Sequence, residues 1–90
     1  MISETETMAA VNPSNLLPMH TKAGRALLDW TANDLAANSS VGISTVKVFE
    51  SGKSVRDVSK QAMIDALEGA GVKLYNGGQP GARLIGNPNA

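Results

Sequence analysis

The feature that most constrains this chain is a helix-start signal at residues 30–35 that recurs shortly afterwards. Thr31 is a good N-cap, and Asp34, three residues later, completes something close to a capping box. Trp30 and Leu35 have the spacing of a hydrophobic staple, in which the residue before the cap packs on the fourth residue of the helix. The sequence therefore predicts a helix from Ala32 to about Asn38, only about two turns long.

A second start signal follows a break at residues 38–40, Asn-Ser-Ser. Val41 and Val46 repeat the staple spacing around Gly42, which is a tolerable cap. The predicted helix runs from Ile43 to about Ser51, with Val46 and Phe49 facing inward and Ile43, Ser44, Lys47 and Val48 facing outward. Helices this short are unstable alone in water, so the pair must pack on neighbouring elements.

The rest of the chain predicts two more helices and a hairpin. Apolar residues recur at helical spacing from about Met19 to Trp30, and again from a start at Ser54 or Asp57 to Ala70. After Gly71 the period changes to two, and residues 72–75 and 82–85 flank the turn-rich stretch NGGQPG. A lone hairpin is marginal in water, so it must pack on the fourth helix or on the same hairpin of a second subunit, and we favour the second subunit.

The predicted organisation is a single domain with short extensions. Residues 1–15 are polar and show no period, so residues 1–17 are expected to form a flexible arm. The helical domain spans 18–71, the hairpin 72–85 is a candidate dimerisation element, and 86–90 is a frayed tail. A domain of 90 residues buries a modest core, so dimerisation would supplement its stability.

Composition argues against catalysis and metal binding. The chain has no cysteine, and its only histidine, His20, is expected at the surface near a helix start. Nothing in the sequence orders Asp57, Ser59 and His20 into a triad, and NGGQPG lacks the Lys-Ser/Thr of a phosphate loop. We therefore expect no enzyme, no metal and no cofactor.

Charge and hydropathy point to a cytoplasmic protein without suggesting a partner. No apolar run approaches the ~20 residues that span a bilayer, and the N-terminus lacks the pattern of a secretory signal. Eight Lys and Arg balance eight Asp and Glu, giving a formal net charge of zero. Charge alone would not have suggested nucleic acid, because neutralising phosphates normally supplies much of that affinity.

Residues 25–52, RALLDWTANDLAANSSVGISTVKVFESG, resemble the Xre/Cro-repressor type of helix-turn-helix regulators. Members commonly read like ARALLGWSQEDLA, then a turn, then V-S-x-S-T-I-x-x-F-E-x-G. The later stretch ALEGAGVKLYNGGQPGARL is similar to the tail of a bacterial branch of that family. The resemblance covers about residues 20–85. It implies a mainly α fold, a compact four-helix helix-turn-helix domain like that of lambda repressor, with a C-terminal β-hairpin.

The resemblance also implies a function and residue roles. The expected protein is a transcriptional regulator, a repressor that binds palindromic operator DNA as a homodimer. The base-reading residues would be Ile43, Ser44, Lys47 and Val48, while Thr45 and Lys53 would contact phosphates. Arg25 and Glu50 fall where many members form a salt bridge between the first and third helices, which would be structural.

Four positions depart from the family pattern. Ala32 replaces a phosphate-binding Gln, Val48 replaces a basic residue, and Gly42 replaces a serine cap. Ser40 replaces the turn glycine, so it must adopt a left-handed conformation at a cost of ~1 kcal/mol or relax the turn. These departures predict modest affinity for DNA and strong reliance on dimerisation. They also leave two alternatives open: an antitoxin that grips a toxin, or a protein-binding antiactivator built on the same fold.

Overall fold

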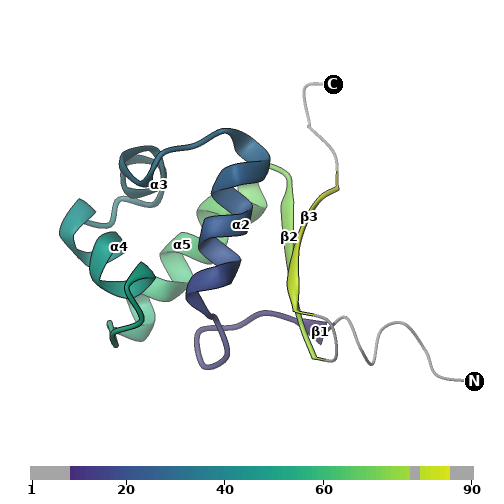
Figure 1. The fold of residues 1–90 in the computed structure, drawn as a ribbon, viewed down its shortest axis with the longest axis horizontal. Coiled ribbons are helices and arrows are strands. Elements are labelled where there is room, and N and C mark those ends of the chain that lie inside the picture. The colour runs from purple at the N-terminus through teal and green to yellow at the C-terminus, as the bar shows by residue number, and fades with distance from the viewer. Residues whose placement is uncertain (1–8, 78–79, 86–90) are drawn as a thin grey trace, which may run out of the picture.

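The computed structural model describes residues 9–77 and 80–85. In this part of the chain, four helices lie on one side of a three-stranded antiparallel sheet (Figure 1). It confirms the predicted mainly α, four-helix domain with a C-terminal hairpin. In chain order the elements are β1 (Ala9–Ala10), α2 (Pro18–Leu28), α3 (Ala32–Ser39), α4 (Ile43–Glu50), α5 (Asp57–Gly69), β2 (Val72–Asn76) and β3 (Gly81–Leu84).

The core lies between the helices and the sheet. Helix α5 supplies its centre, because Met63 and Leu67 are fully buried there. Gly24 lets α2 approach α5 closely: a Cβ atom at this position would lie 3.1 Å from Cδ2 of Leu67. The buried apolar residues come from every helix except α2 and from the sheet and the segment before α2: Val11, Leu16, Leu35, Ala36, Val46, Phe49, Met63, Ile64, Leu67, Val72 and Leu74.

The segment before α2 differs most from the sequence prediction. We expected residues 1–17 to form a flexible arm, but Ala9 and Ala10 pair with β2, and Val11 and Leu16 are buried. The sheet therefore has three strands in the order β1-β2-β3 rather than two. The prediction failed because this segment carries only isolated apolar residues with no period. Residues 1–8 of the predicted arm and the tail 86–90 lie outside the described residues.

The expectation that His20 lies at the surface is wrong. Its side chain is fully buried, and Nδ1 accepts a hydrogen bond of 2.9 Å from the backbone N–H of Leu17. Nε2 lies 2.7 Å from the carbonyl oxygen of Tyr75 on β2. Because Nδ1 acts as an acceptor, Nε2 must carry the proton and donate it to that carbonyl. His20 therefore links the start of α2 to the sheet.

Element ends differ slightly from the predicted ones. Helix α2 begins with Pro18 at a position where a missing N–H costs nothing, and it ends early because Asp29 adopts the left-handed conformation (φ 58°). Arg56, not Ser54 or Asp57, occupies the N-cap position of α5, and its side chain forms no capping hydrogen bond. The hairpin contacts α2 and α5 of its own chain. No helix in the described ranges is long and apolar enough to cross a membrane.

Candidate nucleic-acid interface

Helix α3 begins as the sequence predicts. The Thr31 hydroxyl accepts a hydrogen bond of 3.1 Å from the backbone N–H of Asp34, and the Asp34 carboxylate accepts one of 2.8 Å from the backbone N–H of Thr31. This reciprocal capping box satisfies two N–H groups that the helix itself cannot. The Asp34 carboxylate also lies in the first turn, where the helix dipole favours negative charge.

The turn between α3 and α4 is tight. Ser40 adopts the left-handed conformation (φ 58°), which is the first of the two outcomes expected at this position, and the turn is not relaxed. The backbone N–H of Val41 donates to the carbonyl of Ala36 at 3.1 Å, which closes the end of α3. Gly42 then turns to an extended conformation and serves as the N-cap of α4. Two short helices thus meet in the arrangement of a helix-turn-helix pair.

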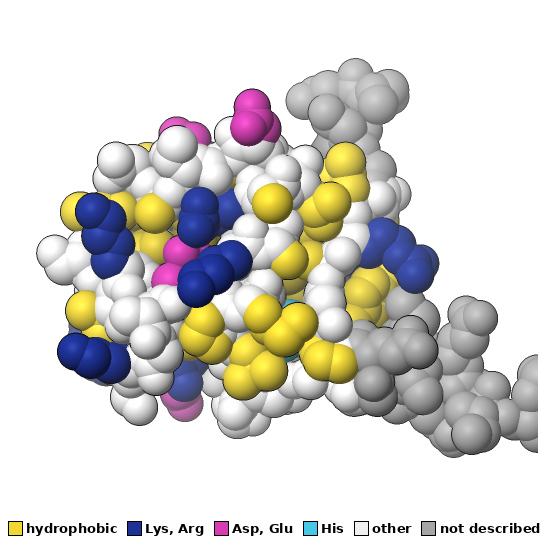
Figure 2. Space-filling view, in the orientation of Figure 1, with side chains coloured by type: hydrophobic (Ala, Val, Ile, Leu, Met, Phe, Trp, Pro, Cys, Tyr) yellow, Lys and Arg dark blue, Asp and Glu magenta, His cyan; other side chains and the backbone are white. Residues whose placement is uncertain are grey.

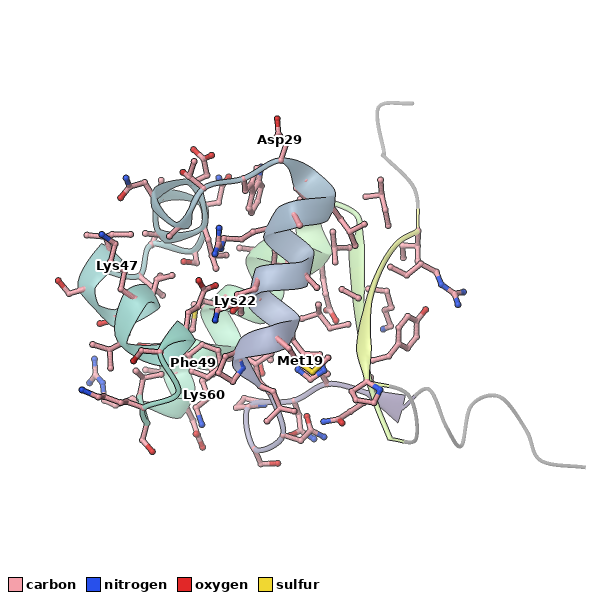
Figure 3. All side chains as sticks on the ribbon, viewed as in Figure 1. Met19, Lys22, Asp29, Lys47, Phe49 and Lys60 are labelled. Atoms are coloured by element: carbon pink, nitrogen blue, oxygen red, sulfur yellow. The ribbon has the colours of Figure 1, made fainter. Side chains whose placement is uncertain are left out.

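Helix α4 has one anchored face and one open face. Val46 and Phe49 are buried as predicted, whereas Ser44, Lys47 and Val48 are exposed. Figure 3 shows Lys47 on the outer side of α4, with Phe49 turned toward α2. The exposed face therefore belongs to a helix whose opposite face is fixed in the core by Val46 and Phe49.

Two residues of α4 are less open than predicted. Ile43 is half-buried and packs against the core, because it precedes Val46 by three positions and lies on the same side of the helix. Thr45 is also half-buried and faces the cleft beside the turn. Of the predicted base-reading residues, Ser44, Lys47 and Val48 form the outward face, and Ile43 lies at its margin.

The predicted salt bridge between α2 and α4 is present. Nη2 of Arg25 lies 2.7 Å from Oε1 of Glu50, and Nε lies 3.1 Å from Oε2. Nη1 also donates to the carbonyl of Trp30 at 3.2 Å. A two-pronged contact of this kind fixes orientation as well as distance. It holds α4 at a defined angle to α2 and cancels the charge of the one carboxylate on α4.

Basic side chains surround the open face of α4. Lys47, Lys53 and Arg56 are exposed, and none of them forms a salt bridge within residues 9–77 and 80–85. Lys22 projects from α2 on the same side (Figure 3). Figure 2 shows Lys and Arg side chains gathered over the end of the molecule that α4 forms. This end offers the positive charge that a polyanion would need.

The formal neutrality of the chain hides this local charge. All eight Lys and Arg residues lie in the described part, whereas two of the acidic residues, Glu4 and Glu6, do not. The described part therefore carries a net charge of +2. Of the acidic residues nearest α4, Glu50 is paired with Arg25 and Asp57 lies 3.8 Å from Lys60, so neither of them opposes Lys47, Lys53 or Arg56 with a free carboxylate.

Sequence reasoning missed Arg56. A cleft of about 270 Å³ separates the start of α4 from the start of α5, and Ser40, Thr45, Arg56 and Ser59 are among its lining residues. Hydroxyl and guanidinium groups are the donors that commonly contact DNA phosphates. The position of Arg56 directly before a predicted helix could have identified it.

The two predicted phosphate contacts lie at opposite ends of α4. Thr45 faces the cleft near the start of the helix, whereas Lys53 and Lys60 line a separate cleft of about 180 Å³ beyond its end. Donors therefore flank the open face on both sides. No protein-family model matches this chain, and no curated protein matches it.

Proposed function

We propose that this protein is a sequence-specific DNA-binding transcriptional regulator that reads operator DNA with α4. The observation that carries the proposal is the division of α4 into an anchored side, Val46 and Phe49, and an open side, Ser44, Lys47 and Val48. An exposed helix of this size fits the major groove of B-DNA. A rigid attachment to the domain is what a base-reading helix needs, and the Arg25–Glu50 bridge supplies part of it.

The exposed side chains suit distinct parts of the duplex. Ser44 can donate to or accept from several base edges, and Lys47 can donate to the O6 and N7 acceptors of guanine. Val48 can contact only apolar groups such as a thymine methyl. Thr45 and Arg56 line a cleft at one end of α4 and Lys53 lines one at the other end; these residues would contact phosphates and so set the position of α4 along the groove.

The regulator would act in the cytoplasm as a homodimer on a palindromic operator. Two copies related by a two-fold axis present two α4 helices to successive major grooves, which doubles the contacts that one small domain can make. Bound near a promoter, such a dimer would repress transcription by occupying the DNA. It requires no cofactor and no catalytic step.

Selection of bound duplexes from a random pool tests the proposal. An enriched palindrome is expected, because a symmetric dimer prefers a symmetric site. Affinity for the selected duplex should then fall steeply as salt is raised, since cations are released when lysines and arginines meet phosphates. If the selection yields no consensus sequence, and if binding is weak and does not change with salt, the proposal is wrong.

One observation favours a second candidate, a protein-binding antiactivator. Val48 is 40% exposed near the middle of the open face, where an apolar side chain gains less from DNA than from another protein. Ala32, half-buried at the start of α3, offers no side-chain donor to a phosphate. The salt titration separates the two candidates, because an antiactivator would bind every duplex weakly and a partner protein tightly.

A further inference from the structure

Strand β3 leaves one edge of the sheet open. It pairs with β2 on one side, and within the described residues no strand lies on its other side. The backbone N–H of Ile85 donates to the carbonyl of Gly71 at 2.9 Å, so the backbone hydrogen-bonding groups of Ile85 point toward β2. Alternate residues of an antiparallel strand direct their N–H and C=O groups to the same side, so the backbone groups of Arg83 also point toward β2. Ala82 and Leu84 therefore turn their backbone groups to the open edge.

The side chains beside this edge are apolar and incompletely covered. Leu84 pairs with Val72, and Ala82 pairs with Leu74, so all four side chains lie on the helix-facing side of the sheet. Val72 and Leu74 are fully buried, but Leu84 is 46% exposed. The helices of this chain thus fail to cover a residue that lies on the core side of its own sheet.

Helix α2 extends this apolar surface. Leu27 lies about 200° around the helix from Arg25, so it occupies the flank opposite α4 and is 42% exposed. Met19 lies on the sheet side of α2 (Figure 3). Three of the seven large exposed hydrophobic residues of the described part belong to this region, and Figure 2 shows apolar side chains gathered there: Met19, Leu27 and Leu84.

We propose that the open edge of β3 pairs antiparallel with the β3 of a second copy, joining two sheets into one of six strands. Two identical antiparallel neighbours are related by a two-fold axis perpendicular to the sheet. All four helices lie on one side of the sheet, so this axis keeps both α4 helices at the same end of the dimer (Figure 1). A partner of another kind would not produce this arrangement, which a symmetric DNA site requires. In this respect the inference rests on the proposed function.

The charge at the edge excludes the register that pairs Arg83 with Arg83 of the second copy. Like charges directly opposite each other destabilise a strand pair. Pairing Leu84 with Leu84 of the second copy places Arg83 opposite Ile85 of the second copy and so avoids facing arginines. The Arg83 guanidinium also lies 5.5 Å from the centre of the Tyr75 ring on β2, away from the open edge. The two Leu84 side chains then meet on the helix side, where each is now half-exposed.

Sedimentation equilibrium of the full chain tests the pairing. The native protein is expected to have twice the monomer mass at concentrations well above those at which it binds DNA. Leu84→Lys should raise the dimer dissociation constant by at least about tenfold, or ~1.4 kcal/mol, because two lysines would face each other. Val58→Lys is the matched control: Val58 is 66% exposed on α5, away from β3, and its change should leave the dimer intact.

A cross-link keeps the test decisive if Leu84→Lys misfolds. The chain has no cysteine, so Leu84→Cys introduces a single thiol. Mild oxidation should yield a disulfide-linked dimer of this variant, and Val58→Cys should form the dimer without a disulfide link. A monomeric native protein, or a Leu84→Cys variant that does not cross-link, would overturn the pairing. A native protein that dimerises through β3 but binds no duplex would instead overturn the DNA proposal, which separates the two failures.

Discussion

Nε2 of His20 lies 2.7 Å from the carbonyl oxygen of Tyr75, and this bond ties the start of α2 to β2 across 55 positions of sequence. The same ring accepts from the backbone N–H of Leu17 at 2.9 Å, so both of its nitrogens are occupied. One buried side chain therefore satisfies two backbone groups that belong to different elements.

Replacing His20 by Phe should destabilise the fold by at least about 2 kcal/mol. The ring volume is kept, but both part-buried hydrogen bonds of the His20 ring, to the N–H of Leu17 and to the C=O of Tyr75, are lost, and leaving polar groups unsatisfied away from water costs about 1–3 kcal/mol. Urea denaturation measures the change in the free energy of unfolding. Met19→Phe, at the neighbouring exposed position, is the control and should change stability by no more than about 0.5 kcal/mol. Equal stability of the two variants would show that the bonds of His20 add nothing.

The Arg25–Glu50 bridge should respond unequally to loss of its two partners. Arg25→Met leaves the Glu50 carboxylate, only 8% exposed, without a partner, at a cost of about 3 kcal/mol. Glu50→Gln costs about 1 kcal/mol, because the Arg25 side chain is 21% exposed and its guanidinium keeps its bond to the carbonyl of Trp30. The combination Arg25→Met with Glu50→Leu should recover most of the loss. Denaturant titrations compare the three, and a double variant no more stable than Arg25→Met would contradict this account.

Gly24 and Gly69 should respond in opposite directions to alanine. A methyl group at Gly24 would lie 3.1 Å and 3.2 Å from the two Cδ atoms of Leu67, which is fully buried and has little room to move. Overpacking of this kind lowers the free energy of unfolding by about 1–3 kcal/mol. This loss outweighs the gain of ~1 kcal/mol expected from the higher helix propensity of alanine. A Cβ atom added at Gly69 would meet no neighbouring atom within 4 Å, so Gly69→Ala should stabilise the folded protein. Thermal unfolding of both variants checks the sign, and a more stable Gly24→Ala protein would be the contrary result.

Lys47→Ala should weaken binding to the selected operator by about 1–3 kcal/mol, if Lys47 contacts a base. Affinity for a random duplex should change much less. Lys73→Ala is a suitable control, because Lys73 lies on β2 and pairs with Arg83 on the face of the sheet away from the helices. Titrations of both duplexes at one salt concentration make the comparison. An equal loss on the two duplexes would reassign Lys47 to a phosphate.

Local signals predicted the helical part of this fold well. The capping box at Thr31 and Asp34 and the cap at Gly42 each act within a few residues, so their outcome can be read from the adjacent sequence. The left-handed Ser40 is one of the two outcomes that the resemblance implied. The buried Val46 and Phe49 follow from helical spacing. The Arg25–Glu50 bridge is long-range, and only the resemblance to a family indicated it.

The parts that escaped prediction depend on contacts between distant residues. Ala9 and Ala10 have no strand propensity of their own, and they form β1 because β2, some 65 positions later, offers an edge. The burial of His20 likewise depends on Tyr75. From the sequence, Gly24 only lowers the helix propensity of its segment, and its close contact with Leu67 explains why a glycine lies there. Arg56 becomes part of the interface only when the turn and α5 meet at the cleft.

The two-residue strand β1 sets a limit on assembly through this sheet. A sheet with two equal free edges can add copies without end, as aggregating edge strands do. Here the chain has already paired its own backbone with β2 at Tyr75 and Asn76, and within the described residues β1 offers an outer edge only two residues long, which is short for recruiting another strand. Growth through β3 would consequently stop at a pair and not continue into a fibre.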